Sequence, residues 1–449
     1  MLAPARRGAV LLTRELRADC LAGYARRCFS STRPVARKPD PGAPKPPYNV
    51  LFFGADFFSC AVLKELWEAG SDLIGKTVVV VPPDQKTGRK GAQTYVPPLK
   101  ILAQQLDFQV EEIPPAELKE WVIPRPWRTT TGSQIPDSEN IIVTASYGHM
   151  LPLEVLNKVQ QLNALNVHPS ILPRWRGAAP IQYSIMKGDA EGANEGDEKH
   201  LGVTVQELSR GAFDKGRILA QKAVPSPVPQ PGYFTLEGHL AREGGLLLVD
   251  VLRNLHARQL AAFPQDSSKA TLAPKITKEV ANIKWNSQSA REVERLNRAI
   301  GHQEPLRGHY VSPSTAAMIT VQMRLSRTIY PLPDQLKDAL PGIVYYDKPK
   351  KVVLVRCADS EEAVAIDQIK KDSGIWVFGN DWYNGIKKLD GQQLLFDTDE
   401  WGYRPSVGWR KKDWRKDVKK PEVPPPHPVP PHLRNNPLPP HLSQNPPGA

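Results

Sequence analysis

Four short apolar runs, separated by segments with helical spacing, constrain the fold of this chain most strongly. The runs occupy residues 49–54, 77–81, 140–145 and 165–168, and they are continuously apolar rather than alternating. Strands that are apolar on both faces are typical of parallel sheets with helices on both sides. Helical spacing at residues 59–69, 97–106 and 233–258 would supply those helices. The sequence therefore predicts an α/β domain built on a parallel sheet.

After about residue 261 the pattern changes. Residues 289–300 have helical spacing, and strand-like runs follow at 317–323, 342–346, 351–356, 374–378 and 392–396. Short strands separated by turns at this spacing are typical of a small β-barrel. We therefore expect a second, β-rich domain in this part of the chain.

The positive charge of the chain lies at its two ends. The net charge is +12, yet residues 1–40 carry nine Lys/Arg against three acids, and residues 401–420 carry eight against two. The body between them is neutral, so any binding of nucleic acid by the body must depend on local groups. Residues 421–449 contain twelve prolines without apolar periodicity. Residues 399–449 are therefore predicted to form a basic, then proline-rich tail.

The first 29 residues are rich in arginine and poor in acids. This composition resembles a mitochondrial transit peptide and predicts a matrix location, with cleavage near Phe29 and Ser30. Residues 30–47 are rich in Pro and Lys and are interpreted as a linker. No uncharged apolar run reaches about 18 residues, so no membrane-spanning helix is expected. The four cysteines form no CxxC pair, and neither a disulfide framework nor a metal site is predicted.

A polar pair at the end of the fourth apolar run is the strongest candidate for chemistry. Asn166 and His168 lie two residues apart, so in a strand both side chains point to one face. An asparagine amide can stabilise an oxyanion, and a histidine can transfer a proton near neutral pH. Asp214, in a turn before a strand-like run, is the candidate carboxylate that would orient the histidine.

This combination suits acyl-type transfer to a nucleophile supplied by the substrate. Ser170 could be proposed as a nucleophile of the protein itself, but it lacks the G-x-S-x-G context that such a serine requires.

Residues 166–182 resemble the signature of the methionyl-tRNA formyltransferase family, with Ile171 in place of the usual leucine. Other blocks occur in the order of that family, at residues 50–54, 83–89, 145–148, 202–205 and 213–216. The resemblance implies a Rossmann-like formyltransferase domain over residues 48–260 and a C-terminal OB-like β-barrel over residues 272–398. The Arg-Trp-Arg-Gly block at 174–177 indicates the tRNA branch of the wider formyltransferase superfamily.

The resemblance also implies an activity: transfer of the formyl group of 10-formyltetrahydrofolate to the amine of methionyl initiator tRNA, by a monomer without a metal. Asn166, His168 and Asp214 would be the catalytic residues. The folate pocket would be shaped by Tyr147, Gly148, Ser170, Ile171, Leu172 and Pro173, and tRNA would be contacted by Arg89, Lys90, Arg174 and Arg176.

Two alternatives remain at this point. One is another folate-dependent formyltransferase, acting on a glycinamide ribonucleotide or an amino sugar. The other is a mitochondrial RNA-binding or ribosome-associated protein that kept the fold without catalysis. The basic cluster at 401–420 interleaves cationic and aromatic residues, and it suits either contact with RNA or a solvated tail.

Overall fold

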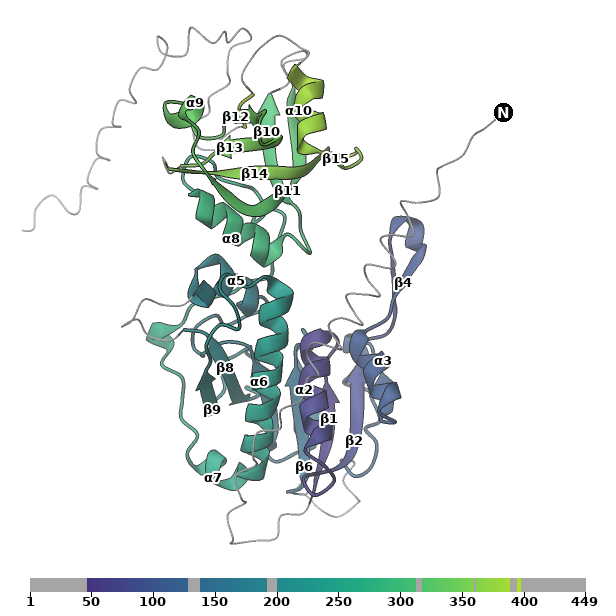
Figure 1. The fold of residues 1–449 in the computed structure, drawn as a ribbon. Helices are drawn as coiled ribbons and strands as arrows, with labels where there is room; N and C mark the ends of the chain where they lie inside the picture. Colours follow the sequence, from purple (N-terminus) through teal and green to yellow (C-terminus); the bar gives the residue numbers. More distant parts are fainter. Residues whose placement is uncertain are drawn as a thin grey trace, which may run out of the picture.

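A computed structural model describes residues 47–127, 138–191, 200–311, 317–358, 361–387 and 394–396. The predicted transit peptide, all but the last residue of the predicted linker, and the predicted basic and proline-rich tail lie outside these residues. The described chain folds around two sheets, the first in the lower part of Figure 1 and the second in the upper part.

The first sheet has seven strands in the order β5-β2-β1-β6-β7-β8-β9. The first five pair in parallel, as the apolar runs predict, whereas β8 pairs antiparallel with β7 and β9 with β8. The strands are β1 (Tyr48–Phe53), β2 (Ile74–Val81), β5 (Gln109–Glu112), β6 (Asn140–Ala145), β7 (Ala164–His168), β8 (Gly202–Glu207) and β9 (Ile218–Ala223).

Alternate residues of the central strand β1 enter two separate cores. Val50 and Phe52 belong to a cluster with the helices on one face, and Leu51 and Phe53 belong to a cluster on the other face. All four side chains are fully buried, which explains why the run is continuously apolar. The helices of this part are α2 (Phe57–Glu68), α3 (Pro98–Gln105), α4 (Leu153–Leu156), α5 (Pro180–Met186), α6 (Tyr233–Arg253) and α7 (Leu255–Leu260).

The helix predicted over residues 233–258 is two helices, α6 and α7, which meet at Asn254. The Asn254 side chain donates to the backbone oxygen of Asp250 at 3.0 Å, and such local bonds compete with the helical ladder. Apolar periodicity continues across the break, so it does not reveal the interruption.

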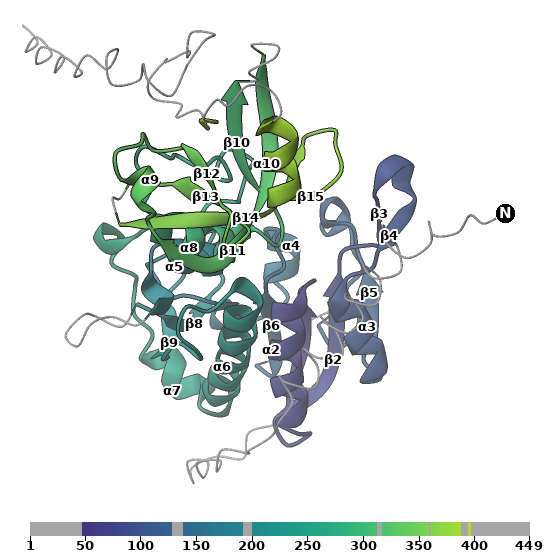
Figure 2. The same cartoon turned by 45° about the horizontal axis from the view of Figure 1, so that its top comes forward.

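A two-stranded hairpin projects from the first domain on the same side as the second sheet (Figure 2). It consists of β3 (Gln85–Thr87) and β4 (Gln93–Tyr95), with a 3-10 turn at Arg89–Gly91 between them. Every residue of both strands is exposed, so the hairpin contributes nothing to the core.

The second sheet is antiparallel and runs in the order β10-β11-β14-β13-β12, with β15 beside β14. Isolated bridges join Phe396 to Tyr310 and Leu395 to Ile343, but among the described residues no continuous ladder closes the sheet. The predicted β-rich second domain is confirmed and its sheet is antiparallel, whereas the predicted OB-like barrel is not confirmed. The strands are β10 (Leu306–Val311), β11 (Met318–Pro331), β12 (Val344–Asp347), β13 (Val352–Arg356), β14 (Glu362–Lys371) and β15 (Val377–Phe378).

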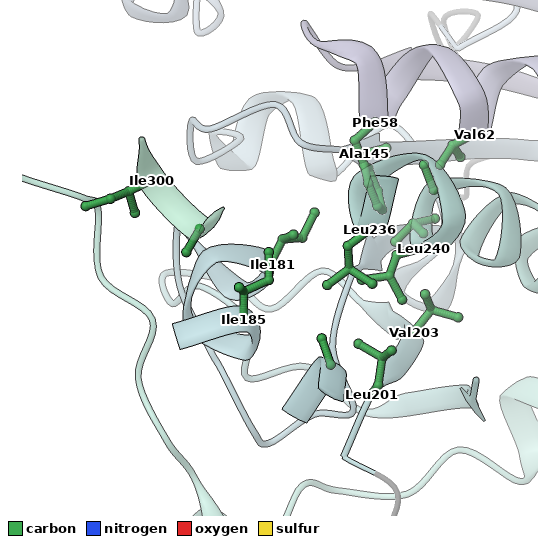
Figure 3. Packing of buried hydrophobic residues seen from close by; sticks show 14 of the residues in the cluster. Phe58, Val62, Ala145, Ile181, Ile185, Leu201, Val203, Leu236, Leu240 and Ile300 are labelled. Carbon is green, nitrogen blue, oxygen red and sulfur yellow. The ribbon is translucent and has the colours of Figure 1, made fainter. Parts of the chain in front are cut away.

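Helix α8 (Ala290–Ile300) joins the two domains; α9 (Asp334–Lys337) and α10 (Gly379–Lys387) complete the second. A capping box of Ser289 and Glu292 fixes the start of α8. The helix packs on α5 of the first domain and on β11 and β14 of the second. One apolar cluster therefore runs through both domains, and Figure 3 labels ten of its members, from Phe58 to Ile300.

Candidate active site

The carboxyl end of β7 places Asn166 beside Asp214, which comes from the turn after β8. The hydroxyl of Thr144, on the neighbouring strand β6, donates to Oδ1 of Asn166 at 2.8 Å. This bond fixes the amide so that Nδ2 faces Oδ1 of Asp214, 3.5 Å away. The parallel register that pairs Thr144 with Asn166 therefore sets the direction of the amide donor.

Asp214 is held by two shorter bonds. Its carboxylate accepts from Nε2 of Gln206 at 3.0 Å and from the backbone nitrogen of Gly177 at 2.9 Å. The residue adopts a left-handed backbone conformation, with φ of 53°, which aspartate tolerates better than most residues. Its side chain is only 10% exposed, so the carboxylate is fixed in a mostly dry environment.

His168 lies between two acceptors. Its Nε2 is 2.9 Å from the backbone oxygen of Trp175, and its Nδ1 is 3.5 Å from Oδ1 of Asp214. Each ring nitrogen of His168 therefore faces an acceptor, and these two contacts set the position and orientation of the imidazole.

The sequence interpretation missed Gln265, which connects several parts of the site. Its Nε2 donates to the backbone oxygens of Asp214 and Gly216 and to the side chain of Gln206, at 2.9–3.0 Å. Its Oε1 accepts two bonds from Arg176, at 2.7 and 3.0 Å. No motif surrounds Gln265, and only the folded chain brings it to the site.

A pocket opens beside Asn166 and Asp214, which are part of its lining. The lining also includes Tyr147 and apolar side chains of the β6–α4 loop, of α4 and of the β8–β9 loop, namely Met150, Leu151, Leu156, Leu208 and Phe213. The Tyr147 hydroxyl is buried and makes no hydrogen bond with the described residues. Burial raises the pKa of Tyr147 to about 12, so its hydroxyl keeps the proton at neutral pH.

The residues predicted to shape the folate pocket separate into two groups. Tyr147 lines the pocket, and Gly148 follows it in the left-handed conformation with φ of 75°. Residues 170–173 do not line the pocket. Their polar backbone groups bond to Thr204 and Gln221 instead, so the turn braces the loop that follows His168. This turn contains Ser170, Ile171, Leu172 and Pro173.

The residues predicted to contact tRNA also lie in different places. Lys90 is exposed at the tip of the β3–β4 hairpin, next to Arg89. Arg174 makes a bidentate ion pair with Asp189 at 2.6 and 2.9 Å. Arg176 is buried and bonded to Gln265, a placement that favours a role inside the site over contact with RNA phosphates.

A second group of acids is buried near the start of α2. Asp56 caps this helix by accepting from the backbone nitrogen of Ser59 at 3.1 Å, and it also accepts from Ser146, directly after β6. Burial and the charge of Asp56 raise the pKa of Glu237 to about 8, so this residue is mostly protonated at neutral pH. It is therefore suited to structure rather than to holding a cation.

Comparisons with known proteins identify the family of this chain. A formyl transferase family model matches residues 49–252, and a model of the formyl transferase C-terminal domain matches residues 275–387. The mitochondrial methionyl-tRNA formyltransferase of Homo sapiens is 33% identical over 363 residues, which cover 79% of this chain and 84% of that protein. This chain belongs to the methionyl-tRNA formyltransferase family. The family that residues 166–182 predict is thereby confirmed.

A bacterial relative supports the assignment. The methionyl-tRNA formyltransferase of Marinobacter nauticus is 36% identical over 251 residues, covering 56% of this chain and 72% of that protein. Among solved structures, HypX from Aquifex aeolicus in complex with tetrahydrofolic acid is 17% identical, with a TM-score of 0.46, over 76% of this chain and 47% of that one. Within the described residues of this family member, no group of three metal-binding side chains and no helix suited to crossing a membrane are found.

Proposed function

We propose that this protein transfers the formyl group of 10-formyltetrahydrofolate to the amine of methionyl initiator tRNA. The proposal rests on one observation. Asn166, His168 and Asp214 lie together beside a pocket that is lined by both polar and apolar side chains. An amide donor, an imidazole and a fixed carboxylate are groups suited to formyl transfer to a substrate amine.

The pocket suits the flat ring system of a folate. Its lining includes several apolar side chains and the aromatic residue Tyr147. Asp214 and Asn166 lie in the same lining. A folate bound in this pocket would have its formyl group close to Asn166, His168 and Asp214, as the proposed reaction requires.

The two long contacts of Asp214 explain how the donors remain available. Gln206 and Gly177 fix Asp214 at 2.9–3.0 Å, whereas Asn166 and His168 face it at 3.5 Å, beyond the usual length of such bonds. Asp214 therefore engages the amide of Asn166 and Nδ1 of His168 only weakly, which leaves both groups available to the formyl oxygen.

In the proposed reaction, the methionyl amine attacks the formyl carbon and forms a new C–N bond. Asn166 and His168 stabilise the oxyanion of the resulting tetrahedral intermediate. The amine loses a proton towards Asp214, directly or through water, and His168 gives a proton to the folate nitrogen as the old C–N bond breaks. The proton count balances because one proton leaves the amine and one reaches the folate.

The tRNA would contact the exposed hairpin tip at Arg89 and Lys90, since the body as a whole is neutral and local cations must supply phosphate contacts. We further infer mitochondrial translation initiation in the matrix as the setting. The arginine-rich composition of residues 1–29 and the mitochondrial names of the mammalian relatives support this location.

Purified protein incubated with formyltetrahydrofolate and methionyl initiator tRNA tests the proposal, with formylmethionyl-tRNA measured by acid gel. We expect formylation, and none of N-acetylmethionyl-tRNA, because its nitrogen is no longer a nucleophile. Formylation of an amino sugar or a glycinamide ribonucleotide in place of the tRNA would contradict the proposal, as would RNA binding without any transfer.

A further inference from the structure

A short 3-10 helix in the first domain, η4 (Asp189–Glu191), contacts both the loop that follows His168 and the helix that begins the second domain. Ala190 between the two acids is fully buried, so η4 is seated in the core rather than on a free loop. Its two carboxylates point to different parts of the molecule.

Asp189 holds the loop that follows His168. Its carboxylate accepts from the indole nitrogen of Trp175 at 2.6 Å, and from Nη2 and Nε of Arg174 at 2.6 and 2.9 Å. The Asp189 side chain is 4% exposed, so these charge-assisted bonds are shielded from water. Asp189 thus fixes the indole of Trp175 and the guanidinium of Arg174.

Trp175 needs such support because it adopts the left-handed conformation, with φ of 59°, which a bulky residue disfavours. The carbonyl of this same residue faces Nε2 of His168 at 2.9 Å. If Trp175 relaxed to an ordinary conformation, this carbonyl would turn away and His168 would lose the partner that sets its ring position. The hydrogen bond that the Trp175 indole donates to Asp189 therefore influences the position of His168 through Trp175.

Glu191 holds the second domain. Its Oε2 accepts from Nη1 of Arg295 at 3.0 Å, and its Oε1 accepts from Arg298; both arginines lie on α8. Arg298 is 1% exposed at its side chain and also donates to the backbone oxygen of Pro231 at 2.8 Å. A shift of α8 would therefore act on η4 through these bonds to Glu191.

We propose that η4 couples the seating of the second domain to the orientation of His168, with Asp189 and Glu191 as positioning residues for formyl transfer. The inference rests on the proposed role of His168. A tRNA that engages the second domain would then find His168 aligned only while the contacts of η4 with α8 and with Trp175 are both in place.

Steady-state formylation by the full chain tests whether Asp189 and Trp175 position His168. We expect D189N to lower kcat about 10- to 100-fold, with the KM values for folate and tRNA nearly unchanged, because a misplaced catalytic group costs rate rather than binding. W175F keeps an aromatic ring and removes only the indole donor, so it should show the same split. The double variant of D189N and W175F should be no slower than D189N alone, because both substitutions disrupt the same hydrogen bond between Trp175 and Asp189.

The variants E191Q and R295M test whether the contact between Glu191 and α8 affects the reaction. Each should lower kcat about fivefold or more. R327Q is the matched control: Arg327 donates to the backbone oxygen of Gln230 at 2.6 Å, a contact between the domains, and lies 3.9 Å from Glu294. No residue of η4 takes part in either contact. We expect R327Q to keep the kcat of the wild type.

Three outcomes would overturn the coupling. In one, D189N and W175F keep kcat within about twofold of wild type while H168A is inactive. In another, E191Q and R295M change only the thermal stability or the KM for tRNA, as a merely structural contact would. In the third, R327Q loses as much kcat as E191Q. An inactive wild-type protein would instead refute the proposed function itself, so the two failures are distinguishable.

Discussion

The β3–β4 hairpin and the end of β7 lie in the same domain but differ in how firmly their side chains are held. Every residue of the two hairpin strands is exposed, and Lys86 bonds within the hairpin, to Thr94 at 3.0 Å. At the end of β7, the carboxylate of Asp214 is in contact with Asn166, His168, Gln206 and Gly177. Chemistry needs fixed geometry, whereas contact with a long polyanion needs accessible charge.

This difference predicts that substitutions at the end of β7 change kcat and substitutions in the hairpin change KM for tRNA. Asp214→Asn should have the largest effect and lower kcat about 10³-fold, because an amide cannot accept the proton of the attacking amine. Formylation at saturating concentrations of both substrates measures the effect. Asp250→Asn is the control, since Asp250 forms a partly exposed pair with Arg258 and should matter little.

Gln265→Leu should follow, with kcat lowered about 10²-fold, because Asp214 and Gln206 lose a shared donor and shift. The variant also leaves buried acceptors unsatisfied, so its free energy of unfolding should fall by about 1–3 kcal/mol. Denaturant titration and kinetics together check both effects. Unchanged kcat in a destabilised protein would show that Gln265 supports the fold alone.

Thr144→Val should lower kcat about tenfold, because the Asn166 amide loses the bond that sets its direction. Thr77→Val is a matched control on β2: its hydroxyl is buried and has no hydrogen-bond partner among the described residues. We expect that control to leave the rate unchanged. Equal rates for the two variants would mean that Asn166 does not need orientation by Thr144.

Lys90→Gln should have the smallest effect: a KM for tRNA raised about threefold with kcat unchanged, and a salt dependence of binding weakened by roughly one phosphate contact. Binding measured over a series of salt concentrations checks the prediction. Lys119→Gln, at another exposed lysine away from the hairpin, is the comparison. Identical salt dependence in the two variants would remove the hairpin from the tRNA site.

The sequence predicts the first domain better than the second, for a physical reason. Strands β1, β2, β6 and β7 are buried on both faces, and burial produces the apolar runs by which they are recognised. In the second domain, β14 carries Asp367 and Gln368 among its apolar residues, and β10 contains Gly308 and His309. The apolar run of β14 covers only residues 363–366, β10 has no continuous apolar run, and neither strand was predicted.

The site divides in the same way. Asn166 and His168 are close in sequence, so strand periodicity alone places them on one face. Gln265 and Asp189 act through contacts between distant segments, and no local pattern reports them. Arg174 and Arg176 look like RNA-binding residues because arginine commonly binds phosphate, yet the fold supplies Asp189 and Gln265 as their partners.

The central claim is that His168 belongs to the machinery of formyl transfer. A single-turnover experiment with His168→Ala, using excess enzyme loaded with formyltetrahydrofolate and then mixed with methionyl initiator tRNA, tests it most directly. We predict that transfer slows about 10³-fold, while folate binding and thermal stability stay close to those of the wild type. Transfer at the wild-type rate by this variant would contradict the account.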